Sequence, residues 1–208
     1  NVTPSANSAI GFDSGADDLE TGAGGGSMVF IKKLTASSSG TLSFVDGASS
    51  VVLDSTYKEY VFTYNNIHAA TDDVEFQFNV SIDGGSNYNV AKTTTYFRTY
   101  NYEDDSDAAL GYRTPRDLAQ GTGFQALTEG QGNGNDESCS GQLTIFNPSD
   151  TTFTKHFIAR NSMYGRTDYE MDIYVAGYAN TTSAVDAVQF KMSSGNIDAG
   201  TITLYGIT

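Results

Sequence analysis

The sequence has a single cysteine, Cys139, and no tryptophan. One cysteine excludes an intramolecular disulfide, so the fold is expected to hold without a covalent cross-link. No stretch approaches the roughly 18 apolar residues of a membrane span. No basic segment followed by an apolar one opens the sequence. We therefore predict neither membrane insertion nor a signal peptide in these residues.

Residues for common catalytic and metal chemistry are also scarce. The chain has only two histidines, His68 and His156, and each falls in or beside a strand-like segment. It contains no G-x-S-x-G, no H-E-x-x-H, no phosphate-binding loop and no dinucleotide fingerprint. We predict that the protein is not an enzyme, that it has no cofactor, and that the histidines are ordinary strand residues.

Basic residues are few, and the negative net charge that results argues against one class of partner. There are 11 lysines and arginines against 25 acidic residues, giving a net charge of −14. Such a field repels nucleic-acid phosphates, so no nucleic acid is expected as a partner. It favours solubility and is compatible with cation binding or with service in salty water.

What is present is typical of strands joined by turns: 22 glycines, many serines and threonines, and 12% aromatic residues that are all Phe or Tyr. The clearest segment is DVEFQFNVSID, where every second residue from Val74 to Ile82 is apolar. We predict an all-β fold, an antiparallel β-sandwich that is jelly-roll-like. The expected strands are 28–36, 40–47, 57–69, 73–83, 88–101, 141–148, 151–161, 168–180, 184–194 and 199–208.

Two regions depart from this pattern. Residues 1–26 have few large apolar side chains and end in glycines, which predicts a flexible arm leading into a domain at 27–208. Residues 103–137 are long, acidic and rich in glycine, which predicts an inserted, outward-facing loop with a short helix near 117–120. At the other end, 184–194 and 199–208 are expected to form a hairpin buried in a sheet.

Two short motifs deserve separate interpretations. SIDGGSNY resembles the Asp-box of sialidase-like propellers, and we expect a turn in which Asp83 accepts backbone N–H groups while Gly84 and Gly85 take positive φ. EDDSD supplies four carboxylates as candidate calcium ligands, and the alternative is a hydrated acidic loop. These residues are Glu103, Asp104, Asp105 and Asp107.

Tyrosines gather beside the long loop. Tyr100, Tyr102 and Tyr112 are candidate glycan or partner contacts, because an aromatic ring covers the apolar face of a sugar. Core packing and subunit contacts are the alternatives.

Four stretches carry a resemblance: YVFTYNNIHAATDDVEFQFNVSIDGGSNYN, AALGYRTPRDLAQGTGFQ, LTIFNPSDTTFTKHFIAR and the C-terminal AVDAVQFKMSSGNIDAGTITLYGI. From about Lys32 onward the chain resembles virion structural proteins of tailed phages of marine bacteria, cyanobacteria among them. No catalytic residues come with this resemblance.

The resemblance implies a capsid decoration or fibre-like subunit on the head or tail of a particle, made in the host cytoplasm and acting by contact. It implies self-association as a homotrimer, with residues 1–26 gripping other virion proteins. The alternatives are a receptor-binding tail-fibre or carbohydrate-binding module that recognises host surface glycans, and a glycan-cleaving enzyme with two carboxylates across a groove.

Overall fold

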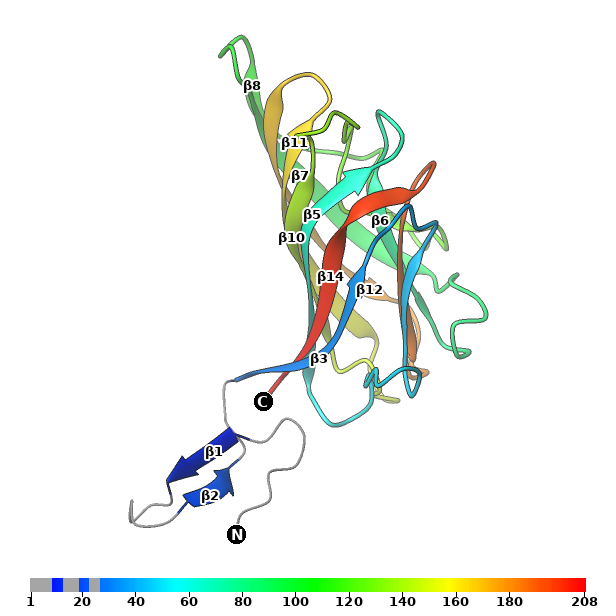
Figure 1. The fold of residues 1–208 in the computed structure, drawn as a ribbon. Coiled ribbons are helices and arrows are strands. Elements are labelled where there is room, and N and C mark those ends of the chain that lie inside the picture. Colours follow the sequence, from blue (N-terminus) through cyan, green and yellow to red (C-terminus); the bar gives the residue numbers. More distant parts are fainter. Residues whose placement is uncertain (1–8, 13–18, 23–26) are drawn as a thin grey trace.

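The protein is described by a computed structural model that covers residues 9–12, 19–22 and 27–208 (Figure 1). These residues form fourteen strands and no helix, and thus no apolar helix of membrane-spanning length. The strands are β1 (Ala9–Phe12), β2 (Leu19–Gly22), β3 (Met28–Thr35), β4 (Leu42–Val45), β5 (Glu59–Ala69), β6 (Phe76–Ser81), β7 (Lys92–Tyr102), β8 (Ala108–Tyr112), β9 (Gln125–Ala126), β10 (Cys139–Phe146), β11 (Lys155–Gly165), β12 (Tyr169–Ala179), β13 (Ala187–Met192) and β14 (Ile197–Ile207).

The strands from β3 onward form two antiparallel sheets that pack face to face. The large sheet has the order β3-β14-β5-β10-β11-β12-β7-β8, and the small sheet has the order β4-β13-β6-β9. Figure 1 shows them as two layers, and aromatic side chains from both fill the space between. The predicted all-β antiparallel sandwich is therefore confirmed.

The strand order is that of a jelly roll. One half of the jelly roll is β3-β14-β5-β10, which is part of the large sheet. The other half is the small sheet, β4-β13-β6-β9. The first strand of the domain, β3, pairs with the last, β14. Four further strands are insertions: β7 and β8 lie between β6 and β9 in sequence, and β11 and β12 lie between β10 and β13. All four extend the large sheet beyond β10, so it has twice as many strands as the small one.

Alternating apolar residues explain why these segments become strands. Along β11 every second residue from Lys155 to Gly165 is buried and the residues between are mostly exposed. One face therefore meets the core and the other is uncovered. The centre of the core is Phe190 of β13, whose ring lies within 6.4 Å, centroid to centroid, of five aromatic rings. These are Phe44, Phe62, Tyr64, Phe76 and Phe78.

The turn at SIDGGSNY forms as expected. The Asp83 carboxylate accepts the backbone N–H of Asn87 at 2.9 Å and the hydroxyl of Ser81 at 2.7 Å. Gly84 and Gly85 have φ of 68° and 78°. Hydrogen bonds from Asn87 and Ser81 lower the pKa of Asp83. The motif is thus a self-contained turn that leads from β6 to β7.

The C-terminal hairpin is a wrong prediction. Strands β13 and β14 are consecutive, yet β13 belongs to the small sheet and β14 to the large one. The turn between them carries the chain across the sandwich, because that placement lets Phe190 and Leu204 face one core from opposite sides. Strand β14 lies between β3 and β5, so its burial was predicted correctly.

The loop at 103–137 also differs from its prediction. Strand β8 pairs with β7, β9 pairs with β6, and residues 125–132 are all buried. Their polar groups are paired inside: the Gln131 amide donates to the Ile67 carbonyl at 2.6 Å, and the Thr128 hydroxyl accepts the Phe76 N–H at 2.7 Å. Most of residues 103–124 are exposed as expected, whereas the polar residues of 125–132 are buried, which is stable because they are hydrogen-bonded.

The helix expected near 117–120 is absent from these described residues for a related reason. The Leu118 N–H donates to the Thr94 hydroxyl at 2.8 Å, and the Leu118 carbonyl accepts the Thr94 N–H at 2.9 Å. The backbone of this segment therefore hydrogen-bonds to β7 and not within a helical turn of its own. Of the arm predicted at 1–26, most residues lie outside those described; within it, β1 and β2 pair antiparallel.

Two buried reactive side chains belong to the core. Cys139 begins β10 and is 1% exposed, and burial raises the pKa of its thiol. Lys92 begins β7 and is fully buried, with its ammonium donating to the Val90 carbonyl at 2.8 Å and to the Asn79 side chain. Burial lowers the pKa of Lys92 to about 7.

Replacing Leu204 by Ala should lower the free energy of unfolding by about 2–5 kcal/mol, because the fully buried side chain would leave a cavity between the sheets. The control is Phe153→Ala, where the side chain is 71% exposed and the expected change is below about 0.5 kcal/mol. Urea unfolding followed by circular dichroism measures both; equal losses would contradict the assigned core.

Stability should also depend on pH through Lys92. An unfolded lysine has a pKa of about 10.4, so between pH 7 and 10 the unfolded chain binds more protons, and the free energy of unfolding rises with pH. Relative to Lys92→Met, the wild type should gain about 3 kcal/mol between pH 7 and 9.5 in urea unfolding. The control is Lys58→Met, at an exposed lysine, which should leave the dependence of the unfolding free energy on pH as in the wild type. If the unfolding free energy of Lys92→Met changed with pH in parallel with that of the wild type, this account would be refuted.

Candidate functional site

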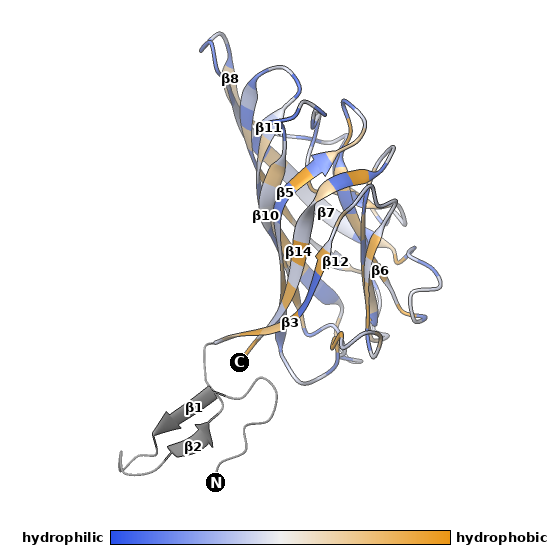
Figure 2. Cartoon of the chain, viewed as in Figure 1, coloured by the Kyte–Doolittle hydropathy of each residue, from blue (hydrophilic) through white to orange (hydrophobic). Residues whose placement is uncertain are grey.

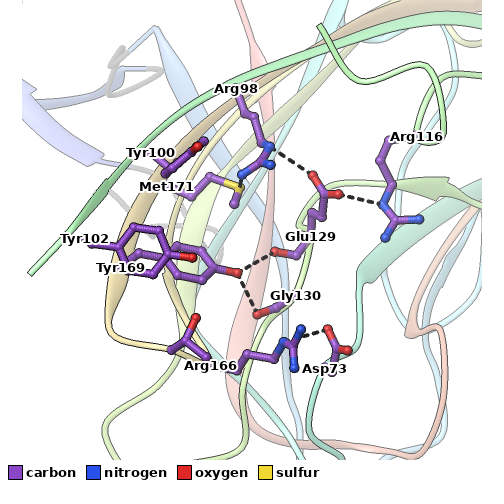
Figure 3. Close-up of a pocket in the computed structure, with 11 residues that line it drawn as sticks. Asp73, Arg98, Tyr100, Tyr102, Arg116, Glu129, Gly130, Arg166, Tyr169 and Met171 are labelled. Carbon is purple, nitrogen blue, oxygen red and sulfur yellow. Dashed lines mark hydrogen bonds and ion pairs between the residues drawn. The ribbon is translucent and has the colours of Figure 1, made fainter. Parts of the chain in front are cut away.

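An open pocket of about 380 Å³ lies where the large sheet extends past the small one (Figure 3). Strands β7 and β12 supply one wall, because their inward-facing residues alternate with outward-facing ones. The other walls come from segments that precede β6 and follow β8, β9 and β11. We call it the arginine pocket; it is lined by Asp73, Arg98, Tyr100, Tyr102, Arg116, Glu129, Gly130, Arg166, Thr167, Tyr169 and Met171.

Glu129 organises the charges of this pocket. Glu129 is 7% exposed, and its carboxylate forms an ion pair with Arg98, whose Nε lies 3.1 Å from a carboxylate oxygen. Arg113 donates to the same carboxylate from Nε, at 3.1 and 3.0 Å, and from a terminal nitrogen. Those hydrogen bonds raise the pKa of Arg113. A buried carboxylate paired with two guanidinium groups is the geometry in which such a charge is tolerated.

Two further arginines complete the cluster. Arg116 pairs with Glu75 at 2.8 Å, while its Nε lies 3.6 Å from the Glu129 carboxylate, too far for a hydrogen bond. That Nε is buried and has no hydrogen-bond acceptor. Arg166 pairs with Asp73 at 3.0 Å. The pocket therefore carries guanidinium N–H donors in excess of the acceptors around them.

Aromatic rings form the opposite wall. Tyr100 and Tyr102 pack edge to face at 5.9 Å, and Tyr102 packs on Tyr169 at 5.3 Å. The Arg98 guanidinium lies over the Tyr100 ring at 4.7 Å. The Tyr169 hydroxyl donates to the Gly130 carbonyl at 3.2 Å, and burial raises the pKa of Tyr169. The wall is thus rigid, and Tyr100 and Tyr102 are partly exposed in it.

The three tyrosines predicted as contacts do not share one site. Tyr100 and Tyr102 line the arginine pocket, whereas Tyr112 lies opposite Phe97 on the other face of the sheet. The Tyr112 hydroxyl donates to the Asp117 carboxylate at 2.5 Å. The first two therefore remain candidates for a ligand site, and Tyr112 belongs to a different surface.

The candidate calcium ligands are not brought together. Asp104 accepts the backbone N–H of Ser106 at 3.0 Å, and Asp107 accepts the Tyr100 hydroxyl at 2.8 Å. Within the described part of the chain, no group of three or more His, Cys, Asp or Glu side chains is placed to hold a metal ion. Glu103 and Asp105 lie in the same exposed turn.

The arginine cluster was missed by sequence reasoning, although a signal was present. The chain has only five arginines, and four of them stand beside tyrosines or prolines in YFRTYNY, GYRTPR and YGRTDY. A rare cation repeatedly placed near aromatic residues, in a chain of net charge −14, is the pattern that would have found the site. The acidic partner Glu129 had no comparable signal, since acidic residues are abundant throughout.

Replacing Glu129 by Gln should lower the free energy of unfolding by about 3 kcal/mol, because Arg98 and Arg113 would then lie together without their carboxylate. The control is Asp172→Asn, which breaks the 2.9 Å pair with the exposed Arg160 and should cost less than about 1 kcal/mol. Urea unfolding of both variants tests this; a larger loss for Asp172→Asn would show that Glu129 does not organise the pocket.

Comparison of the chain with protein-family models, with curated proteins and with solved structures gave no match. The likeness to phage virion proteins therefore stays a prediction that depends on the four stretches of sequence given above.

Proposed function

We propose that the protein is a non-enzymatic structural subunit of a tailed-phage particle, a capsid decoration or fibre-like appendage at the particle surface that works by assembly. The observation that carries this proposal is a row of mostly apolar residues on the outer face of the large sheet, which is exposed at Phe30 and Ile158 and buried between them at Val61 and Thr144. The sequence resemblance supplies the phage context. The jelly roll is compatible with it, since such folds occur in viral capsid and in lectin domains, though a fold alone does not define a function.

The outer row crosses seven strands in direct register. Its residues are neighbours pair by pair, and the row spans roughly 30 Å at the usual strand spacing. The row consists of Phe30, Tyr205, Val61, Thr144, Ile158, Ala176 and Thr95. Figure 2 shows hydrophobic positions on strands of this sheet, including β3 and β14. Phe30 is 57% exposed and Ile158 is 49% exposed.

The row broadens toward β8. Phe97 stacks on Tyr174 at 4.8 Å with an interplanar angle of 3°, and Phe97 lies opposite Tyr112. Leu110, on the same strand as Tyr112, is 71% exposed. Phe97, Tyr174, Ile158 and Ala176 line one open, mainly apolar pocket on this outer face, and an exposed apolar patch of this kind is typical of an interaction site.

We take a second copy of this chain as the occupant, in a closed homotrimer. Self-association of a chain with a charge of −14 is least costly where the surface has no unpaired charge. Beside the row, Arg160 of β11 pairs with Asp172 of β12 at 2.9 Å, so these two charges cancel. The part of the face around Ile158 therefore combines apolar area with a paired charge, as homo-oligomer interfaces do.

The second candidate is the receptor-binding module. The specific observation in its favour is that Tyr100 and Tyr102 line a pocket on the side of the sheet opposite the outer row. Both activities are compatible in one chain, because the two surfaces are separate.

Ile158→Asp should dissociate the oligomer, since it places a charge in the middle of the row. The control is Phe153→Asp, in which a side chain that is 71% exposed lies outside the row. Sedimentation velocity of the full chain should give a trimer for the wild type and for Phe153→Asp, and a folded monomer for Ile158→Asp.

A monomeric wild type at tens of micromolar would overturn the assembly proposal, and so would dissociation by Phe153→Asp alone. Imaging of an intact particle tests the phage context independently, by the position and symmetry of this chain in it.

A further inference from the structure

We propose that the arginine pocket binds a carboxylate-bearing sugar, such as a uronic-acid residue of an acidic polysaccharide. This inference goes beyond the assembly proposal and does not depend on it. It is based on three features of the pocket: its charge, its unused donors and its aromatic wall.

The charge of the pocket is opposite to that of the chain. Three arginines line it against two carboxylates, Asp73 and Glu129, so its lining carries a net positive charge. With Arg113 behind Glu129, four of the five arginines of the sequence are in this one cluster. An anion is repelled by most of this protein's surface and attracted here, which localises an acidic ligand to the pocket.

The donors are arranged for a carboxylate. Arg116 Nε is buried without a hydrogen-bond acceptor, so the carboxylates of the protein do not use every guanidinium donor of the cluster. Arg98 pairs through its Nε with the carboxylate of Glu129, and Arg166 pairs through its Nε with the carboxylate of Asp73. Each guanidinium has five N–H donors, so their terminal nitrogens retain donors for a bidentate acceptor. Figure 3 shows these groups with Glu129 and Asp73 along one side of the pocket.

The aromatic wall favours a sugar over a bare inorganic anion. Tyr102 and Tyr100 are partly exposed, and the buried Tyr169 and Met171 support them from behind. A pyranose ring can lie against such rings with its apolar face while its substituents reach polar groups across the pocket. The carboxylate of a uronic acid would then face the arginines.

The test is a titration of the full chain with glucuronate, with glucose and with sulfate, followed by isothermal calorimetry or by NMR. Glucuronate should bind, glucose should bind at least about tenfold more weakly because it lacks the charge, and sulfate should bind more weakly because it lacks the ring.

Two matched variants locate the site. Arg166→Gln removes an arginine whose ion pair with Asp73 is partly exposed, and it should weaken glucuronate binding at least about tenfold. Arg160→Gln breaks a similar Arg–Asp pair on the opposite face of the sheet and should leave binding unchanged. Thermal unfolding of both variants verifies that each is folded.

Equal affinity for glucuronate and glucose, or no binding of glucuronate at millimolar concentration, would overturn the proposal. So would a loss caused by Arg160→Gln but not by Arg166→Gln. Sulfate binding tighter than glucuronate would mean an inorganic-anion site and would refute the sugar assignment. None of these results bears on whether the chain forms trimers, because the outer row is tested by different variants.

Discussion

Packing of aromatic rings around Phe190 connects the two sheets, and the rest of the molecule depends on it. Phe190 is on the small sheet, while Phe62 and Tyr64 reach it from the large one. Aromatic pairs of this kind combine large buried area with preferred ring geometry. Because no disulfide and no helix reinforce the described fold, this contact fixes the spacing and relative position of the layers. Everything that lies at the edges of the sandwich is placed by that central contact.

The unequal size of the two sheets then creates both candidate surfaces. The small sheet covers only part of the inner face of the large one, and β7 and β12 extend beyond it. Segment 125–132 covers some of that overhang, and the arginine pocket occupies what stays open. On the outer face the same overhang lengthens the apolar row. Two insertions, which together add four strands to a jelly roll, thus generate a polar concavity on one side and an apolar surface on the other.

The sequence predicted the strands well where one side of a segment was apolar. The alternation from Val74 to Ile82 identified β6, and each of the ten expected segments overlaps an observed strand. It failed where a pairing partner had to be chosen, as for β13 and β14, because a short turn fits both a hairpin and a crossing between sheets. It failed again at Gln131, whose polarity says nothing about the buried carbonyl that it satisfies.

The site was harder to predict than the fold for a spatial reason. Arg98, Arg116 and Arg166 are brought together by antiparallel pairing and by loops, and their sequence separation carries no periodicity that would reveal it. Tyr100 and Tyr102 were predicted as contacts because neighbouring aromatic residues are visible in the sequence, and both line the arginine pocket. Tyr112, only ten residues later, lies on the opposite face because β7 and β8 pair across a turn and Tyr112 shares its face with Phe97.

The position of Cys139 has a practical consequence. The chain carries one thiol, at the start of β10 and behind the core, where a raised pKa keeps it in the unreactive neutral form. A thiol reagent reaches it only when the large sheet separates from its neighbours. Its alkylation rate under native conditions therefore reports how often the sandwich opens, with no label or engineered residue required.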